Sequence, residues 1–513
     1  MKQQPPLVIL GFDAADPDYL LRWANEGYLP TLAAILRRGC WAKTGGPEMI
    51  VEHGVWPQLF SGVSRGRVGY YYFRQLNSRS YDLRLTTGRD WDAPPFWAGL
   101  RGGEKKVAIF DAPELSPVPG LRGVQLANWA MHRGWVARDP AERPQTDPPG
   151  LLADVQQIFG PQLEILENSA ADLAEDQRLF RLLLEQTARS GKLYRELLQR
   201  DRFDLVVMVF APSHTASHQF WKYRPEAADP DTANGASELT DAIRAVYQAI
   251  DHEMGLVLAQ MPAAANVIVL SSVGLRDDCP SGGLMEAFCR QLGYEVAPPF
   301  KPSLMSVARQ IVPERWRVAL SRGFSREQRE QLLAQQFRGK TDWSKTTAFA
   351  IPSAYAGFVR VNLQGREPAG IVVPGREYAE LLCRLETDLR QLVDPLTGAP
   401  AVHQVARTRE LFGAAAHEAL PDLFVLWKST KQFRQKLLHP RAEITQQRPE
   451  WFRISDHSQN GFVAAAGPSI RAGGALGEIP LLDLAPTFLA LLEEPVPAQL
   501  TGTVIPAFAP RHG

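Results

Sequence analysis

The stretch that decides the fold is DLVVMVFAPSHTASHQFW, residues 204–221. Its first half is a continuous apolar run, which is typical of a strand buried on both faces in a parallel sheet. Its second half places His214 and His218 four residues apart, so that on a helical turn both imidazoles share one face. Ligands of open α/β sheets bind where the strands end at their carboxyl edge. The stretch therefore predicts a buried strand that leads into a candidate metal site, although the spacing alone fits structural histidines equally well.

The composition is that of a globular protein, with 45% hydrophobic and 22% charged residues and no low-complexity tract. A chain of 513 residues suffices for one large α/β domain with insertions, or for two or three ordinary domains. The 56 Lys and Arg residues equal the 56 Asp and Glu residues, so no net field attracts nucleic acid or an anionic membrane. We therefore expect neither partner, and an anionic substrate would need a local binding site.

The cysteines and the N-terminus bear on the compartment. Cys40, Cys279, Cys289 and Cys383 are scattered without CxxC spacing, which does not indicate a disulfide framework. The first apolar run is too short for a signal peptide, and no stretch approaches the roughly 18–20 apolar residues of a membrane span. We expect a cytoplasmic protein. Its oligomeric state cannot be read from the sequence.

Strand-like and helix-like segments alternate along the chain. Apolar runs predict strands at 7–12, 107–110, 204–210, 266–272, 357–362, 422–427 and 461–466. Helical periodicity marks 29–38, 174–200, 240–260, 377–392 and 481–492. This alternation predicts an α/β fold with a mostly parallel central sheet sandwiched by helices.

Two segments interrupt the predicted core. We expect the core to comprise residues 1–275 and 346–513, with a Pro/Gly/Trp-rich excursion from the sheet at about 74–173. Residues 276–345, which contain a Gly-Gly pair and several prolines, are predicted to form an inserted cap segment.

Polar side chains at the ends of the predicted strands are the candidates for chemistry. They are Asp13, His214, His218, Ser272 and His457. Neutral imidazoles suit Zn²⁺, and three protein ligands leave one position open, as in catalytic zinc sites. Asp13 is a candidate fourth ligand, a carboxylate that orients a histidine, or the cap of the following helix. His457 taken alone is more readily explained as a structural residue.

Several sequence blocks run from end to end of the chain. The first is VILGFDAAD at residues 8–16, followed by GYLPTL at 27–32. The others are Trp56 with 60–62, 362–372, 421–423, 456–468 and 482–487. In this order they resemble the type I phosphodiesterase/nucleotide pyrophosphatases of the alkaline phosphatase superfamily. The resemblance implies an alkaline phosphatase-like α/β sandwich.

That family usually employs two divalent metals, often zinc, and a Thr or Ser nucleophile just before the helix that starts near Trp56. The resemblance places the second metal on His214, His218 and His457. His214 replaces an Asp, as in a subgroup whose loop reads Glu-x-His-x-x-x-His-Gln-Phe-Trp, and Pro212 stands at that Glu position. The second metal site is therefore expected to survive.

The first metal site departs from the family pattern. Asp13 is present, but Ser272-Val273-Gly274 occupies the expected Asp-His-Gly position. The nucleophile position falls nearest to Glu52, and no hydroxyl side chain stands between Gly46 and Ser61. A two-metal clamp with a phospho-enzyme intermediate is therefore not expected.

The resemblance and its departures together predict a metal-dependent hydrolase or transferase with one zinc ion on three histidines and an activated water. Glu52 or His53 would act as general base, or Glu52 as a covalent nucleophile. The expected substrate is a small molecule, with a phosphate ester as the first candidate. Two alternatives stay open: a repurposed enzyme of this fold with a non-phosphoryl reaction, and a catalytically silent protein that binds a ligand.

Overall fold

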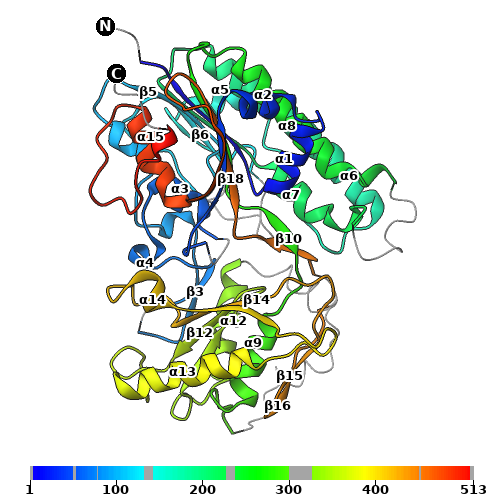
Figure 1. The fold of residues 1–513 in the computed structure, drawn as a ribbon, viewed down its shortest axis with the longest axis vertical. Helices are drawn as coiled ribbons and strands as arrows, with labels where there is room; N and C mark the ends of the chain where they lie inside the picture. Colours follow the sequence, from blue (N-terminus) through cyan, green and yellow to red (C-terminus); the bar gives the residue numbers. More distant parts are fainter. Residues whose placement is uncertain are drawn as a thin grey trace. The chain divides into compact units, whose positions relative to one another are not determined.

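The computed structural model describes residues 4–49, 53–77, 79–131, 143–226, 237–299, 326–449 and 452–508. The chain forms two compact units, whose segments can be followed in Figure 1. Unit 1 comprises Met1–Ser64, Gly88–Arg276 and Ser455–Gly513, and unit 2 comprises Arg65–Thr87 and Asp277–Ile454. The domain boundaries predicted from the sequence stay a prediction.

Unit 1 is built on a nine-stranded sheet with the order β19-β2-β18-β9-β1-β8-β5-β6-β7. In that order the strands are Gly474–Pro480, Cys40–Gly45, Gly461–Ala466, Asn266–Ser271, Leu7–Phe12, Leu205–Phe210, Lys106–Phe110, Arg122–Ala127 and Gln145–Asp147. The pairs β9-β1-β8-β5-β6 and β19-β2 are parallel, whereas β18 is antiparallel to both neighbours and β7 to β6. The predicted fold class, a mostly parallel central sheet covered by helices, is confirmed.

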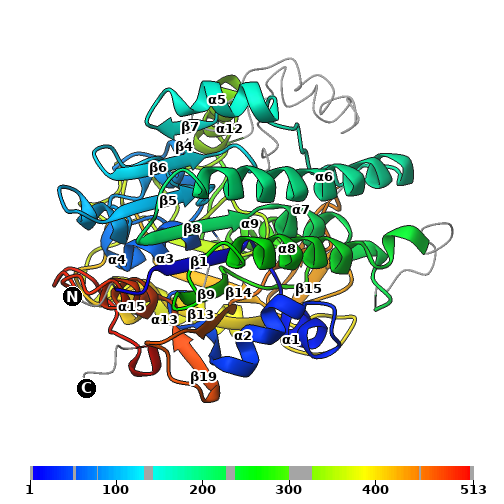
Figure 2. The ribbon, with the colours of Figure 1, turned by 90° about the horizontal axis from the view of Figure 1, so that it is seen from above.

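The central strands are apolar because both faces of the sheet are covered. Every residue of β1, β8, β9 and β18 is buried. Figure 1 shows one group of helices on one face of this sheet and a smaller group on the other. The first group is α1 (Pro17–Asn25), α2 (Pro30–Arg38), α6 (Leu173–Leu198), α7 (Pro212–Gln219) and α8 (Ala242–Leu258). The second contains α3 (Val55–Ser61) and α15 (Leu484–Leu491), and α5 (Leu151–Phe159) lies near the β7 edge in Figure 2.

Local capping explains where two of the helices begin. Asp172 accepts a hydrogen bond from the Glu175 backbone N–H, while the Glu175 carboxylate accepts one from the Asp172 N–H. This reciprocal pair is a capping box, and it starts the long helix α6, which runs beside α8 in Figure 2. Asp16 caps α1 by accepting from the backbone N–H groups of Asp18 and Tyr19. The helix cap is therefore Asp16 and not Asp13.

Unit 2 has a sheet of its own, with the order β11-β12-β14-β13 and antiparallel pairing throughout. These strands are Ala348–Ile351, Gly357–Val361, Leu423–Trp427 and Val402–Arg407. The helices are α4 (Arg65–Val68), α9 (Gly282–Gln291), α12 (Arg326–Gly339), α13 (Arg376–Arg390) and α14 (Thr408–Phe412). Short hairpins pair β3 (Arg74–Leu76) with β4 (Leu83–Leu85) and β15 (Lys436–His439) with β16 (Ala442–Thr445).

Two expectations about sheet membership were wrong. The strands predicted at 357–362 and 422–427 were expected in the central sheet, but as β12 and β14 they belong to the separate sheet of unit 2. Conversely, the segment 74–173 supplies β5, β6 and β7 to the central sheet instead of leaving it. A run of apolar residues indicates that both faces of a strand are covered, but it does not indicate which sheet the strand joins. Among the described helices, none has the length and apolarity needed to cross a membrane.

Candidate metal centre

Three neighbouring strands of unit 1 bring their polar residues to one edge of the sheet. β1 lies between β9 and β8 and is parallel to both, with Phe12 opposite Ser271 and Phe210. Asp13 follows β1, and helix α7 begins at Pro212 directly after β8. Because parallel strands end at the same edge, Asp13 and the histidines of α7 are brought together there.

His457 reaches this edge by a different route. It ends the short strand β17 (Ser455–His457), four residues before β18. β18 is antiparallel to β9 and pairs Phe462 with Ser271, so the start of β18 lies at the carboxyl end of β9. The direction of β18 therefore carries the residues before it to the histidines of α7, more than 200 positions away in the sequence.

The three histidine side chains converge through their Nε2 atoms. His457 Nε2 lies 3.1 Å from His218 Nε2 and 3.2 Å from His214 Nε2. An imidazole nitrogen carries either a hydrogen or a lone pair, so His457 Nε2 cannot donate to one neighbour and accept from the other. Either one N–H on His457 Nε2 is shared by the lone pairs of its two neighbours, or three lone pairs would be directed at one cation.

The spacing of the donor atoms also fits a metal ion. In a tetrahedral site with Zn–N distances of about 2.0–2.1 Å, two ligand nitrogens lie about 3.3–3.4 Å apart. The measured separations of 3.1 and 3.2 Å are close to this value. In the part of the chain that the structure describes, His214, His218 and His457 are the group of side chains suited to hold a metal ion. Asp13 and His53 do not belong to that group.

Each imidazole has an oxygen near its other nitrogen. His214 Nδ1 lies 3.3 Å from Asp13 Oδ2, and His218 Nδ1 lies 3.1 Å from the Ser455 hydroxyl. For His457 the neighbour is Asp456 Oδ1, at 3.8 Å. A carboxylate beside Nδ1 favours the tautomer that protonates Nδ1 and leaves Nε2 with its lone pair. Asp13 thus favours the tautomer of His214 that a metal site needs.

Asp13 accepts a hydrogen bond from Trp56 that the sequence did not predict. The indole Nε1 of Trp56, in the first turn of α3, donates a 2.7 Å hydrogen bond to Asp13 Oδ1. The Ser213 hydroxyl also donates to the backbone carbonyl of Asp13, at 2.7 Å. In the sequence Trp56 marked the start of a helix and one block of the family resemblance, and no sequence pattern reports that an indole and a carboxylate 43 positions apart will meet.

The serines after β9 have a structural task. The Ser271 hydroxyl accepts from the Ala15 N–H at 2.8 Å, and the Ser272 hydroxyl faces the Ala14 N–H at 3.4 Å. Both therefore support the loop that follows Asp13. Val273 is buried beside them and offers no ligand atom.

The predicted catalytic pair is placed only in part. His53 lies in the turn that leads into α3, and Glu52 lies outside the described residues. The roles predicted for both residues stay predictions.

A buried carboxylate lies at the same sheet edge, after β5. Asp111 accepts hydrogen bonds from the backbone N–H groups of Trp129 and Ala130 and from the hydroxyl of Tyr194. Burial raises the pKa of Asp111 from 3.8 to about 6, against the lowering effect of these donors. All its hydrogen-bond donors are neutral. The carboxylate links the end of β5 to the Trp129–Ala130 backbone and to Tyr194, and it is not a member of the histidine cluster.

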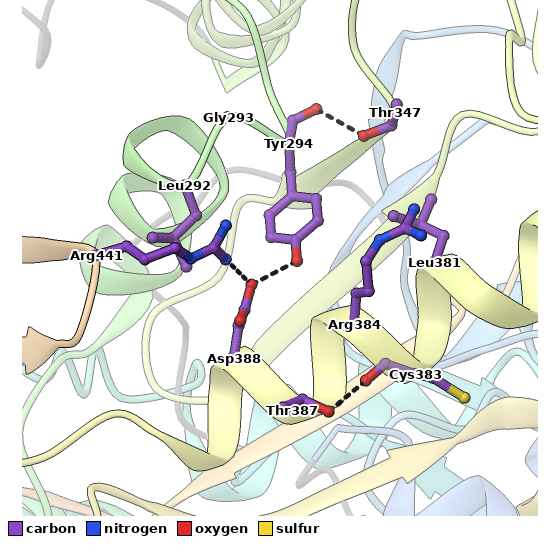
Figure 3. A pocket seen from close by; sticks show the side chains of 10 residues that line it. All are labelled: Leu292, Gly293, Tyr294, Thr347, Leu381, Cys383, Arg384, Thr387, Asp388 and Arg441. Atoms are coloured by element: carbon purple, nitrogen blue, oxygen red, sulfur yellow. Dashed lines mark hydrogen bonds and ion pairs between the residues drawn. The ribbon is translucent and has the colours of Figure 1, made fainter.

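Unit 2 contains a hollow of about 430 Å³ lined by α13, by the residues that follow α9 and by Arg441 in the turn between β15 and β16, as Figure 3 shows. At its floor the Tyr294 hydroxyl donates a 2.6 Å hydrogen bond to Asp388, and the Arg441 guanidinium donates to the same carboxylate. Burial, assisted by the Asp388 charge, raises the pKa of the Tyr294 phenol. These groups bind one another, and the hollow has none of the histidines of the metal centre.

Comparison with known proteins places the chain in a family. The profile of the type I phosphodiesterase/nucleotide pyrophosphatase family matches residues 7–282, more than half of the chain. The chain belongs to this family of the alkaline phosphatase superfamily, which is a family of hydrolases that typically depend on metals. Among curated protein sequences none matches significantly.

One solved structure supports the fold, and others are similar at lower scores. Phosphonoacetate hydrolase from Sinorhizobium meliloti, in complex with phosphonoformate, is similar with a TM-score of 0.50 and 12% identity, over 96% of this chain and 95% of that chain. An inactive variant of murine ectonucleotide pyrophosphatase/phosphodiesterase 5 with AMP gives a TM-score of 0.45 and 13% identity, over 96% of both chains. The human enzyme of that name gives 0.44 and 10%, over 97% of both. At such identities the likeness concerns the fold alone.

Proposed function

We propose that this protein is a metal-dependent hydrolase or transferase of phosphate esters that works with a single ion on His214, His218 and His457. The observation that carries the proposal is the convergence of three Nε2 atoms, at 3.1 and 3.2 Å, in a member of a phosphodiesterase family. The substrate class, a phosphodiester or phosphate monoester, comes from family membership alone.

The donor set accounts for the choice of zinc. Three neutral imidazoles form a full complement of protein ligands for a catalytic zinc site and leave one position open. A zinc ion bound there would supply Lewis acidity, which polarises a phosphoryl oxygen and acidifies water. His214, His218 and His457 would hold the ion, and the predicted general base is Glu52 or His53, both of which precede α3 in the chain.

The departures from the family pattern support one ion and not two. The resemblance expects an Asp-His pair where this chain has Ser272, whose hydroxyl faces the loop after β1, and Val273, which is buried and has no ligand atom in its side chain. It also expects a Thr or Ser nucleophile, and no hydroxyl side chain stands between Gly46 and Ser61. The proposed enzyme therefore attacks with water and forms no phospho-enzyme. The covalent alternative, with Glu52 as nucleophile, ranks second because a carboxylate nucleophile would itself need activation.

Two other functions compete with this one. The same missing residues suit a repurposed enzyme that catalyses a non-phosphoryl reaction, or a silent protein in which the histidines hold a structural ion. The exposure of the cluster argues against a silent protein with a structural ion, because two of its three imidazoles are only half buried. A structural zinc site is normally closed by four protein ligands.

Metal analysis and a substrate panel decide between these functions. The purified chain is expected to bind about one zinc per molecule and to hydrolyse chromogenic phosphodiesters or monoesters only when metal is present. His457→Ala should abolish both properties, and Glu52→Gln should abolish turnover while zinc remains bound. The matched control is His252→Ala, which removes an exposed histidine of α8. Zinc binding without any phosphoester hydrolysis would favour the repurposed or silent protein, and absence of zinc binding would refute the proposal.

A further inference from the structure

The contacts of Asp13 connect α3 to the histidine cluster. Asp13 Oδ1 accepts the 2.7 Å hydrogen bond from Trp56, while Oδ2 lies 3.3 Å from Nδ1 of His214. The nitrogen of His214 that faces the other imidazoles is Nε2, on the opposite side of the ring. Asp13 thus touches the back of a ligand and lies outside the group of atoms that face the candidate ion.

The sequence of β1 makes room for the indole. Gly11 lies two residues before Asp13, and a Cβ atom there would come within 2.9 Å of Trp56 Cη2 and of a Val209 methyl group. The ring also stacks on Phe60, with centroids 5.4 Å apart and an interplanar angle of 21°. The missing side chain at Gly11 and the ring of Phe60 together set the position of Trp56.

We propose that Trp56 and Asp13 are positioning residues for His214, and that Asp13 holds no ion of its own. The inference rests on the proposed function, because it concerns the same metal centre. The Trp56 N–H fixes one carboxylate oxygen and thereby the orientation of the other. The second oxygen holds the His214 ring and favours the tautomer with Nδ1 protonated, which leaves the Nε2 lone pair for the metal. The carboxylate that the family pattern assigns to a first metal ion here accepts a hydrogen bond from an indole.

The test is zinc binding by the full chain, and its readout does not depend on turnover. The protein is stripped of metal and titrated with Zn²⁺ against a chromophoric chelator, which yields both stoichiometry and affinity. The variants are Trp56→Phe, Asp13→Asn and Gly11→Ala. The matched control is Trp91→Phe, because Trp91 is equally buried and donates its indole N–H to Ser61, with a length of 3.0 Å.

The wild type is expected to bind one zinc per chain. Asp13→Asn should keep that stoichiometry with about 10–100-fold weaker affinity, the usual effect of removing a group behind a ligand. Trp56→Phe should weaken zinc about 10-fold, and its combination with Asp13→Asn should be no weaker than Asp13→Asn alone, because both changes act on one contact. Trp91→Phe should bind zinc as the wild type does.

Gly11→Ala covers the case in which Trp56→Phe does not fold. It alters no polar atom, and it should weaken zinc binding by displacing the indole. Wild-type affinity in Trp56→Phe or in Gly11→Ala would overturn the role of Trp56. Two zinc ions in the wild type and one in Asp13→Asn would show that Asp13 is a ligand, which overturns the inference and leaves a metal-dependent function standing. A wild type that binds no zinc would refute both.

Discussion

Two buried clusters of polar side chains, one in each unit, are built on opposite plans. In unit 2, Arg366 donates two hydrogen bonds to Asp422, at 2.9 and 2.6 Å. The same carboxylate accepts from the Val361 N–H and the Tyr378 hydroxyl, both at 2.7 Å. Although burial alone would raise the pKa of Asp422, the Arg366 guanidinium holds it below its usual value. Charges of opposite sign complete this cluster from within.

The histidine cluster of unit 1 brings together three side chains of the same kind. The Nε2 atom of His457 lies at about the spacing of metal ligands from the Nε2 atoms of His214 and His218, and no opposite charge belongs to this group. The oxygens of Asp13, Ser455 and Asp456 lie on the other side of the rings. Both clusters look alike in the sequence, as polar residues next to buried strands. The difference teaches that a cluster of opposite charges supports the fold, while a cluster of like donor atoms that could hold a cation is a candidate for function.

The largest effect is expected from breaking the complete cluster. Asp422→Ala removes the buried carboxylate that accepts two hydrogen bonds from Arg366, which keeps its 2.8 Å contact with Glu367. Loss of one partner from a buried ion pair costs about 3–5 kcal/mol. Urea denaturation should show this loss. Zinc affinity of the folded protein should stay at the wild-type value, because Asp422 belongs to unit 2. A loss below about 1 kcal/mol would contradict the reading of this cluster as a support of the fold.

Asp111 sharpens the comparison, because it is a buried carboxylate with neutral donors only. Its pKa is raised to about 6, so between about pH 4 and 6 the folded state binds more protons than the unfolded state. Its contribution to stability is therefore full below about pH 4 and is lost as the pH rises through about 6, by about 3 kcal/mol at most.

The comparison of the wild type with Asp111→Asn isolates this contribution, since the amide does not titrate. In urea denaturation from pH 4 to 7, the stability of the wild type relative to the variant should fall as the pH rises. Asp18→Asn removes an exposed carboxylate and serves as the control. A difference that is constant with pH would mean that Asp111 titrates like an exposed carboxyl group.

The third prediction concerns the incomplete cluster. A ligand at 100 times its dissociation constant stabilises the folded state by about 2.7 kcal/mol. Zinc should stabilise the wild type accordingly in thermal unfolding, and a chelator should remove the effect. In His457→Ala the metal-free protein should unfold near the wild-type temperature and gain nothing from zinc. An equal gain in this variant would place the zinc elsewhere.

The smallest effect is expected on the surface. Arg376 and Glu380 form an ion pair across one turn of α13, with a length of 2.6 Å, but both side chains are exposed. A double-mutant cycle with Arg376→Ala and Glu380→Ala should give a coupling of about 0.5 kcal/mol or less, which salt reduces further. If this coupling were as large as the effect expected for Arg366 and Asp422, burial would not explain why ion pairs differ in their contribution to stability.

Much of the central sheet could be predicted from the sequence. The runs predicted at 7–12, 204–210 and 266–272 became β1, β8 and β9 to within one residue, because a strand buried on both faces has apolar side chains throughout. The helices predicted at 174–200 and 240–260 were found at Leu173–Leu198 and Ala242–Leu258. The strands of unit 2 were also predicted, but not the fact that they form a separate sheet. The hydrophobic pattern of a short apolar run does not depend on which strands pair with it.

The sequence by itself determined the pair His214 and His218, since residues four apart on a helix share one face whatever the rest of the chain does. It also determined the absence of ligand atoms at Val273. Only the tertiary structure decided that His457 completes the cluster, because the antiparallel direction of β18 carries it there. The same holds for Trp56, whose indole reaches Asp13 only because Gly11 leaves space beside β1. Spacing along the chain controls contacts within an element, whereas contacts between elements depend on the order and direction in which the strands assemble.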